Sequence, residues 1–559
     1  LEGSARHTGT HACGVIIGPE NLIEHVPLST ARDSNLMVTQ YEGKLVESVG
    51  MLKMDFLGLK TLSIIKDAIL NIKAGYDLEI DIDNIPLDDE LTFQLYQRGE
   101  TIGTFQFESE GMRTHLRDLK PNDIEDLIAM NALYRPGPMS FIPVYINRKH
   151  GREKVEYPHP MLEEILKPTF GIMVYQEQIM QTAQIMAGFS LGKADILRRA
   201  MGKKKAEIMQ EQKIVFVEGA LKKGIEKEKA EEIFGVMERF AEYGFNRSHS
   251  AAYSIIAYQT AYLKAHYPAE YMAAVLTHNL NDIKKITQFI EESKRQNIDV
   301  LGPDVNESHF DFTVTREGTI RFGLGAIKGV GEAAVRAIIN ERNANGPFTS
   351  VFDMAKRVSL QAVNKTCFEA LAKAGAFDSF EGTHRAQFFF RQNSDDSIFL
   401  EKVIRHGAGY QERKNSAQQS LFGDDSSVEV PDPDMPDCTP YSKIEQLRKE
   451  KEVTGFYISG HPLDDFSLEI SNFCEASLNE VFNNTQKYFN RVVNVAGMIT
   501  GVQERMSQTG NPYASFMLED FNDTRRFFLF SEDYLKLKHF LVEGFNVLVQ
   551  VRIQFRRGG

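Results

Sequence analysis

Residues 51–59 read MLKMDFLGL, which places one carboxylate, Asp55, in a run of Leu, Met, Phe and Gly. An ionised carboxylate beside apolar neighbours costs free energy unless a cation or hydrogen-bond donors offset its desolvation. Such a residue is therefore a candidate metal ligand or catalytic group. An aspartate before an apolar periodic segment is also a common helix start, so these nine residues alone leave a capping role open.

Length and composition indicate a multidomain globular protein. At ~150 residues per domain, the 559 residues allow three to five domains. No run of about 18 apolar residues exists to cross a bilayer. Four cysteines without a CxxC pair argue against a disulfide framework and a structural zinc site. We expect a soluble cytoplasmic protein. Its net charge of −13 restricts nucleic-acid binding to local basic patches.

The hydrophobic pattern changes along the chain. Residues 5–60 read as short sheet pieces, and residues 61–280 as the largest helical block. Short strands follow near 300–325, with helix candidates over 326–375. Residues 406–440 are rich in Gly, Ser, Gln, Asp and Pro, which is typical of an exposed linker. From 491 onward, four alternating segments with one helix before the last predict a small barrel.

Two segments of the helical block combine cations with other functional groups. Residues 188–205, GFSLGKADILRRAMGKKK, gather Lys193, Arg198, Arg199 and Lys203–Lys205 around the single acid Asp195. They could grip phosphates or form a solvated helix end. Residues 243–267 interleave Arg247, His249, Lys264 and His266 with Tyr253, Tyr258 and Tyr262. That mixture suits a nucleotide or nucleic acid, although an amphipathic helix with mostly buried tyrosines also explains it.

Four shorter motifs add candidate sites. Arg135 lies in the rigid loop YRPGP, which presents its guanidinium. Residues 327–331, IKGVG, match a helix-hairpin-helix whose glycines let the backbone approach a phosphate. Leu421 and Phe422 of QQSLF are bulky apolar residues in a polar tract, which suggests a docking peptide. His7, His11 and Cys13 could form a metal cluster, but closed sites usually need four ligands and no further ligand is near in sequence.

Taken together, these motifs resemble the bacterial DNA polymerase III alpha subunits, the C-family replicative polymerases. TGTHACGVII, MLKMDFLGL, GTFQFES, LYRPGP, GFSLGKADILRRAMGKKK, GFNRSHSAAY, FGLGAIKGVG and ISGHPLDDF occur in the family's order across essentially the whole chain. The resemblance implies a multidomain, mainly α fold with α+β parts. Its expected domains are a partial nucleotidyltransferase-type palm at 1–65, helical fingers at 66–310, a tandem helix-hairpin-helix domain at 311–405, a flexible segment with a clamp-binding motif at 406–440, a connector at 441–484 and an OB-fold β-barrel at 485–559.

The resemblance also implies roles for individual residues. Asp55 corresponds to the third of three catalytic aspartates and to a magnesium ligand, with Lys53 beside it near the primer end or triphosphate. The residues expected to contact nucleotide phosphates or line their pocket are Arg135, Arg198, Arg199, Lys203, Ser248 and His249. Duplex DNA is expected at Lys328, Gly329 and Gly331, the sliding clamp at Gln418, Leu421 and Phe422, and single-stranded template at the barrel.

The implied chemistry is template-directed addition of dNTPs to a primer 3′-OH with two Mg²⁺ ions. The other two catalytic aspartates lie upstream of Ala5 in the family, as do the phosphoesterase-like domain, the early palm and the thumb. We therefore expect a portion of the subunit that does not polymerise DNA alone, with other replicase subunits as partners and weak or absent Mg²⁺ binding. The alternative is a non-catalytic adaptor that binds DNA and the clamp.

Overall fold

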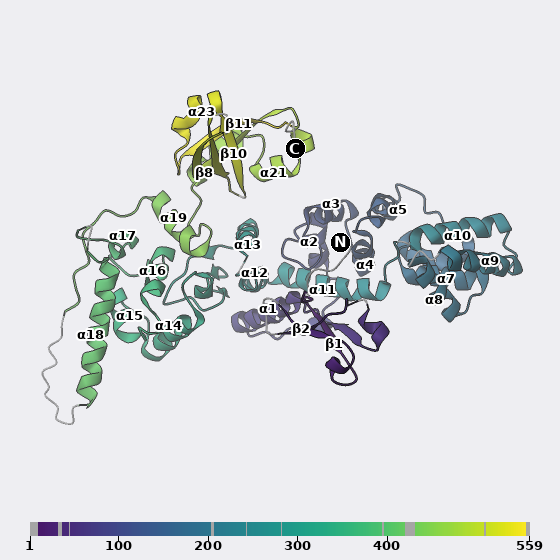
Figure 1. Cartoon of the computed structure of the whole chain (residues 1–559), viewed down its shortest axis with the longest axis horizontal. Coiled ribbons are helices and arrows are strands. Elements are labelled where there is room, and N and C mark those ends of the chain that lie inside the picture. The colour runs from purple at the N-terminus through teal and green to yellow at the C-terminus, as the bar shows by residue number, and fades with distance from the viewer. Residues whose placement is uncertain are drawn as a thin grey trace. The chain divides into compact units, whose positions relative to one another are not determined.

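The computed structural model describes residues 9–31, 36–43, 45–202, 206–241, 243–280, 282–393, 396–419, 431–507, 510–521 and 523–554. These residues form two compact units, Leu1–Ser63 and Ile64–Gly559, which we call the N-terminal and C-terminal units. Most of the described elements are helices, with small sheets between them (Figure 1). The predicted mainly α fold with α+β parts is confirmed in these terms. No described helix is both long and apolar enough to span a membrane.

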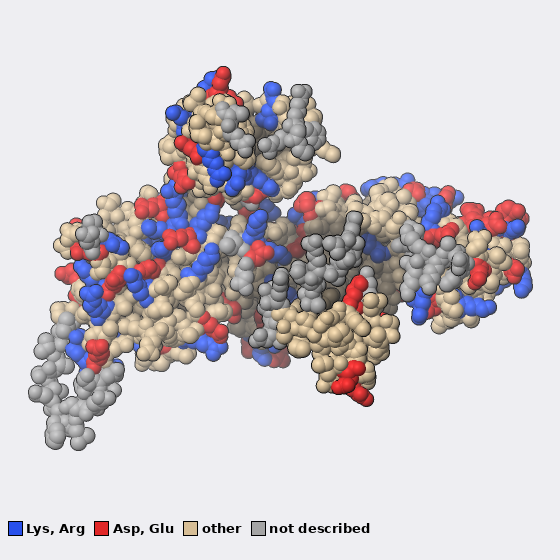
Figure 2. Space-filling view, viewed as in Figure 1, with Lys and Arg blue, Asp and Glu red and all other residues tan. Residues whose placement is uncertain are grey.

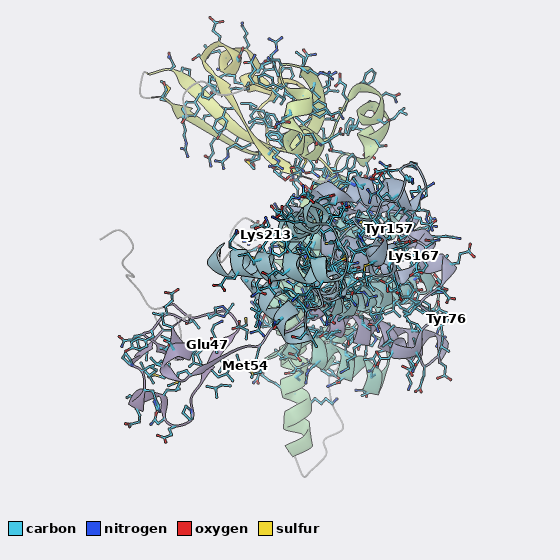
Figure 3. All side chains as sticks on the ribbon, turned by 90° about the vertical axis from the view of Figure 1, so that its right-hand side faces the viewer. Glu47, Met54, Tyr76, Tyr157, Lys167 and Lys213 are labelled. Carbon is cyan, nitrogen blue, oxygen red and sulfur yellow. The ribbon has the colours of Figure 1, made fainter. Side chains whose placement is uncertain are left out.

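The N-terminal unit consists of two antiparallel strand pairs around a small core. Strands β1 (Gly14–Ile17) and β4 (Leu52–Asp55) pair in a register that sets Gly14 opposite Asp55, while β2 (Leu28–Thr30) pairs with β3 (Met37–Thr39). Because strand side chains alternate, one face of the β1–β4 pair carries Val15, Ile17, Leu52 and Met54, all exposed. On the side visible in Figure 2 the N-terminal unit carries few Lys, Arg, Asp and Glu side chains, and Figure 3 labels Met54.

The first part of the C-terminal unit is helical, as its 3.6-residue periodicity predicted. Its helices are α1 (Lys60–Tyr76), which begins in the N-terminal unit, α2 (Glu90–Arg98), α3 (Glu110–Leu119), α4 (Ile124–Leu133), α5 (Ile142–Lys149), α6 (Glu163–Leu166), α7 (Gln176–Ala187), α8 (Leu191–Gly202), α9 (Ala206–Lys222), α10 (Lys227–Ala241), α11 (Arg247–His266), α12 (Pro268–Thr277) and α13 (Ile283–Arg295). Helix α11 packs against α2, α4 and α12 and so ties this part together.

The far end of α11 is structural. Lys264, which the sequence grouped with candidate phosphate-binding cations, is completely buried. Its ammonium donates to Glu292 Oε1 at 2.6 Å and to the carbonyl oxygens of Glu100 and Ile102, both at 2.7 Å. A buried charge requires such partners, since an unpaired one would be strongly destabilising. Of the three tyrosines expected to be mostly buried, Tyr258 is buried, whereas Tyr253 and Tyr262 are half-buried.

A second helical region begins with a three-stranded sheet in the order β5–β7–β6, made of β5 (Val300–Leu301), β6 (Thr313–Val314) and β7 (Ile320–Arg321). The helices that follow are α14 (Glu332–Asn345), α15 (Val351–Arg357), α16 (Lys365–Ala374), α17 (Arg385–Phe388), α18 (Phe399–Gln419) and α19 (Lys443–Thr454). Helix α19 docks through a buried ion pair in which Arg385 donates to Glu450 at 2.7 Å.

The prediction of an exposed linker at 406–440 is wrong for its first part, because residues 406–419 belong to helix α18. Their polar composition suggested an exposed coil, but Gly407 is buried against α15. Gln411 donates from Nε2 to the carbonyl oxygens of Ala355, Lys356 and Val358 at the end of α15. These carbonyls have no partner within their own helix, so Gln411 supplies one.

The last region is a four-stranded antiparallel sheet in the order β10–β9–β8–β11. It is preceded by α20 (Ser467–Phe473), α21 (Leu478–Asn483) and α22 (Thr485–Tyr488), and comprises β8 (Val492–Met506), β9 (Pro512–Glu519), β10 (Thr524–Phe530) and β11 (Asn546–Arg552), with α23 (Ser531–Leu537) before β11. The four predicted strands and the helix are confirmed. The predicted closed barrel is not, because the edge strands β10 and β11 do not pair with each other in the described residues.

Candidate active site

Asp55 ends strand β4 with its carboxylate bound to a lysine two residues earlier. Lys53 donates from Nζ to Oδ1 at 2.7 Å and to Oδ2 at 2.9 Å. Residues i and i+2 share one face of a strand, which brings the two side chains together. The hydrogen bond from Lys53, helped by its charge and by His11, lowers the pKa of Asp55 below its usual range. The carboxylate is therefore ionised, and the Lys53 ammonium occupies both of its oxygens.

The burial expected of Asp55 from its apolar neighbours is wrong. Its side chain is 51% exposed, because Met54, Phe56 and Leu57 are themselves exposed. A short sequence window cannot show whether apolar neighbours cover a residue or face water. The capping alternative also fails, because Asp55 lies inside a strand and α1 begins only at Lys60.

Two further ligand-type side chains lie beside Asp55. His11 Nδ1 is 3.9 Å from Asp55 Oδ1 and 3.8 Å from Cys13 Sγ. Among the residues that the structure describes, only these three form a group of His, Cys, Asp or Glu with ligand atoms all within 4.8 Å of one another. The sequence offered His7, His11 and Cys13 as a metal cluster without a further ligand nearby. The strand register brings Asp55 to His11 and Cys13, while His7 lies outside the described residues.

Of the side chains of His11, Cys13 and Asp55, only the Asp55 carboxylate is a suitable ligand for Mg²⁺. Mg²⁺ is held by oxygen ligands, usually one or two carboxylates together with substrate phosphates and water. Imidazole and thiolate suit softer ions. Asp55 can therefore provide one oxygen ligand for Mg²⁺.

In the C-terminal unit, Arg135 lies against the segment that precedes α11. Its guanidinium donates to the carbonyl oxygen of Tyr243 and lies 4.5 Å from the centre of the Phe245 ring. It also donates from Nε to the carbonyl oxygen of Ala132 at 3.1 Å. Partial burial lowers the pKa of Arg135, but an arginine remains charged near neutral pH. The loop thus fixes a cation beside an aromatic ring.

Arg198 reaches the same segment through Gln176, the first residue of α7. Arg198 donates to Gln176 Oε1 at 3.0 Å, and Gln176 donates from Nε2 to the carbonyl oxygen of Gly244 at 3.1 Å. Arg198 and Arg199 both pair with Asp195 at 2.8 Å. The hydrogen bond from Arg198 is the main cause of the lowered pKa of Asp195. The single acid of this basic run therefore holds both arginines in place.

The N-terminus of α11 completes the cluster. Asn246 caps it by accepting from the backbone N–H of His249 at 2.8 Å. Ser248 and His249 are exposed, and the His249 ring lies 5.4 Å from Phe245 and 4.2 Å from Tyr253. Helix N-termini favour anions, but the backbone N–H of Arg247 already donates to Glu177. We name Arg135, Arg198, Ser248 and His249 the fingers cluster, since residues 243–246 connect them.

Of the predicted phosphate-binding residues, Lys203 lies outside the described residues. Arg199 is 68% exposed and, within the described part of the chain, is linked to the fingers cluster through Asp195. The sequence alone identified Arg135 and Arg198, the two cations that are linked to residues 243–246. Gln176, which joins Arg198 to this segment, was missed, because a glutamine at a helix start carries no distinctive signal.

The predicted hairpin Ile327–Gly331 lies between the 3₁₀ helix η7 (Leu324–Ala326) and α14. Lys328, Gly329 and Gly331 are exposed, and Gly329 adopts a φ of 90°, a conformation that favours glycine. However, the backbone N–H of Lys328 donates to the carbonyl oxygen of Val453 at 2.7 Å. That donor is used within the chain, so a phosphate would have to meet the lysine side chain and the glycines.

Of the predicted clamp motif, Leu421 and Phe422 lie outside the described residues, and Gln418 lies in the last turn of α18. In the C-terminal sheet, Arg526, Phe528 and Phe530 point outward from β10. The rings of Phe528 and Phe530 are 6.0 Å apart and nearly parallel, and Tyr513 stacks on Phe530 at 5.7 Å. An exposed row of aromatic rings beside an arginine is a surface on which nucleic-acid bases can stack.

An acid-bearing strand, a helical region with clustered arginines and an exposed glycine hairpin between helices are together typical of nucleic-acid enzymes. Three family models match the chain: the bacterial DNA polymerase III alpha NTPase domain at residues 1–58, the finger domain of the same subunit at 61–224, and a helix-hairpin-helix motif at 297–388.

Curated relatives match across the whole chain. It is 45% identical to the DNA polymerase III subunit alpha of Borreliella burgdorferi, with 100% of this chain and 48% of the relative covered. The subunit of Thermus aquaticus is 44% identical over 99% of this chain and 44% of the relative. That of Pseudomonas aeruginosa is 41% identical over 98% and 48%. The chain therefore belongs to the family of bacterial DNA polymerase III alpha subunits. It spans about half the length of the curated relatives it matches.

Proposed function

We propose that this chain supplies part of the catalytic subunit of a replicative DNA polymerase, which adds dNTPs to a primer 3′-OH under the direction of a template. The observation that carries this proposal is the fingers cluster, where two arginines and a histidine are gathered around residues 243–246. The positive charge of its two arginines and the neighbouring ring of Phe245 suit a nucleoside triphosphate.

Within this proposal, Arg135 and Arg198 bind the triphosphate, with Arg199 and Lys203 adding charge nearby. His249 and Ser248 line the same pocket. Because Asp195 and Gln176 fix the Arg198 side chain, little conformational entropy is lost when a phosphate binds. The contribution of these residues to the rate is positioning and stabilisation of developing negative charge.

Asp55 is the proposed metal-binding carboxylate, with Lys53 beside it. When bound, Mg²⁺ would lower the cost of forming the 3′-oxyanion and neutralise charge on the departing pyrophosphate. Lys53 would pair with the Asp55 carboxylate before the metal binds and then turn toward the triphosphate or the primer end. In the family, this site takes two metal ions and three carboxylates.

The remaining predicted surfaces serve DNA and the clamp. We place duplex DNA at Lys328, Gly329 and Gly331, through contacts to phosphates. Single-stranded template would stack on Tyr513, Phe528 and Phe530 of the C-terminal sheet, which would correspond to the OB domain. Gln418, Leu421 and Phe422 would bind the sliding clamp. Replacing both Leu421 and Phe422 with Ala would then abolish clamp pull-down, while retained binding would identify a plain linker.

The proposal is tested in a polymerase-active protein that contains this sequence. Asp55→Asn should reduce the single-turnover rate by orders of magnitude and leave DNA affinity nearly unchanged. Arg198→Ala should instead weaken dNTP binding about tenfold or more, as expected for a lost charged contact. Asp77→Asn is the matched control, since Asp77 is exposed with a φ of 53° that asparagine tolerates. Unchanged turnover in Asp55→Asn would refute the catalytic role of Asp55.

A further inference from the structure

His11 and Cys13 form, together with Asp55, a mixed donor set of which the proposed polymerase reaction uses only the carboxylate. His11 and Cys13 precede β1, and Asp55 ends β4. Because β1 and β4 are antiparallel with Gly14 opposite Asp55, the residues just before Gly14 are brought to the carboxylate. The group therefore depends on strand pairing rather than on proximity in sequence.

The separations of the ligand atoms are close to those of a tetrahedral metal site. Zinc binds sulfur at about 2.3 Å, imidazole nitrogen at about 2.0–2.1 Å and carboxylate oxygen at about 2.0–2.2 Å, so neighbouring ligands lie roughly 3.3–3.7 Å apart. Here Cys13 Sγ and Asp55 Oδ1 lie 3.8 and 3.9 Å from His11 Nδ1. Movements of a few tenths of an ångström would bring these two pairs to bonding geometry.

The histidine already presents the required nitrogen. The backbone N–H groups of Gly14 and Cys13 donate to His11 Nδ1 at 2.7 and 3.2 Å. An atom that accepts hydrogen bonds carries no proton, so the lone pair of His11 lies on Nδ1, the atom nearest Cys13 and Asp55. A metal ion would take this lone pair in place of the two amide hydrogen bonds.

The chemistry of the donors selects the ion. A thiolate and an imidazole bind Zn²⁺ and similar ions far better than Mg²⁺ or Ca²⁺, which require oxygen. We propose that His11, Cys13 and Asp55 bind a thiophilic divalent cation of the Zn²⁺ class, with a fourth position open to water. Binding deprotonates the Cys13 thiol and releases its proton to solvent.

Lys53 competes with the metal in this site. Its ammonium occupies both oxygens of Asp55, at 2.7 and 2.9 Å, and must leave when the cation binds. If the proposed function is right, the same carboxylate serves Mg²⁺ in catalysis. Zn²⁺ at this site would then inhibit polymerisation, and this last consequence alone depends on the proposed function.

The test is a titration of the 559-residue chain with Co²⁺, in a non-chelating buffer with a phosphine reductant. We expect a thiolate-to-cobalt charge-transfer absorption and the d–d bands of a tetrahedral ion, saturating at one equivalent. Zn²⁺ should abolish both, and millimolar Mg²⁺ should not. Absence of the charge-transfer band, or its displacement by Mg²⁺, would overturn the proposal.

Variants assign the ligands. Cys13→Ser should remove the charge-transfer band, while His11→Ala and Asp55→Asn should each weaken Co²⁺ binding at least tenfold. Lys53→Met should strengthen it, a result that a purely structural role of Lys53 does not predict. Cys474→Ser is the control, because Cys474 lies in the C-terminal unit, and it should leave the spectrum unchanged.

Each variant is compared with the unmodified chain by circular dichroism, to establish that it folds. A charge-transfer band that survives in Cys13→Ser would show that the thiolate comes from elsewhere and would refute the site. The spectra do not depend on polymerase activity. Failure of the metal site therefore leaves the proposed function standing, and an inactive polymerase site leaves the metal site standing.

Discussion

At the scale of single residues, Lys53 lowers the pKa of Asp55. Its hydrogen bond is the main cause of the lowered pKa of this exposed carboxyl. Lys53→Ala should therefore raise the pKa of Asp55 toward the ordinary value of about 3.9. A pH titration of the Asp55 side-chain carboxyl carbon by NMR measures it. The pKa of Asp55 is lower in the folded chain than in the unfolded chain, so the Lys53–Asp55 pair stabilises the fold at pH values above the unfolded pKa. This stabilisation is lost as the pH falls through the folded pKa.

The chain offers a matched control for this measurement. Lys73 pairs with Glu79 and lowers its pKa in the same way, and both carboxyls are exposed. Lys73→Ala should raise the pKa of Glu79 and leave that of Asp55 unchanged. If Asp55 titrated identically with and without Lys53, its depressed pKa would have another origin, and Lys53 would not compete with a metal there.

Single residues also show how much of the candidate site could be predicted from the sequence. Asp55, Arg135, Arg198 and His249 were identifiable because each belongs to a motif of several adjacent residues. The grouping of His11 and Cys13 with Asp55 was not, because it requires the register of two strands about 40 residues apart. Lys264 was misread for a similar reason: its partner Glu292 lies on another helix, and the residue type alone does not show burial.

At the scale of elements, α18 shows how packing overrides composition. Adding a Cβ to Gly407 would place it 2.5 Å from the Ala355 carbonyl oxygen on α15, closer than atoms tolerate. Gly407→Ala should therefore lower the free energy of unfolding by about 1–3 kcal/mol, as for an overpacked core position. Denaturant unfolding, followed by a probe that reports on this region, measures the change.

Gly409, two residues further along α18, provides the opposite expectation. A Cβ there would meet only the end of the flexible Arg413 side chain, at 3.3 Å. Gly409→Ala should then stabilise the helix by up to about 1 kcal/mol, because alanine has the higher helix propensity. Equal effects of the two substitutions would show that α18 does not pack closely on α15.

The elements themselves were predicted well wherever a hydrophobic period was long. The helices over 61–280 and the strands β8–β11 follow their 3.6- and 2-residue patterns. The predictions were wrong where the structure depends on contacts with distant parts of the chain rather than on local sequence. Closure of the C-terminal sheet depends on whether two edge strands meet, and the start of the linker depends on whether α15 offers a surface to residues 406–419.

At the scale of the whole molecule, the proposed function requires a chain whose own net charge is −13 to bind DNA, a polyanion. Affinity for duplex DNA then depends on a few local cations that release counterions, and it should fall steeply with salt. We expect log K to decrease linearly with log salt concentration, with a slope of about −0.9 for each phosphate contacted. Fluorescence anisotropy with labelled duplex between low and physiological salt measures this slope.

The contribution of the hairpin can be separated from that of the other cations. Lys328 is exposed beside two exposed glycines, so Lys328→Ala should weaken binding to all duplex sequences alike and reduce the slope by about 1. Lys229→Ala on α10, which removes a lysine already paired with Glu232, should leave both values unchanged. An affinity that did not vary with salt would contradict phosphate binding, since only contacts that displace counterions from DNA respond to salt in this way.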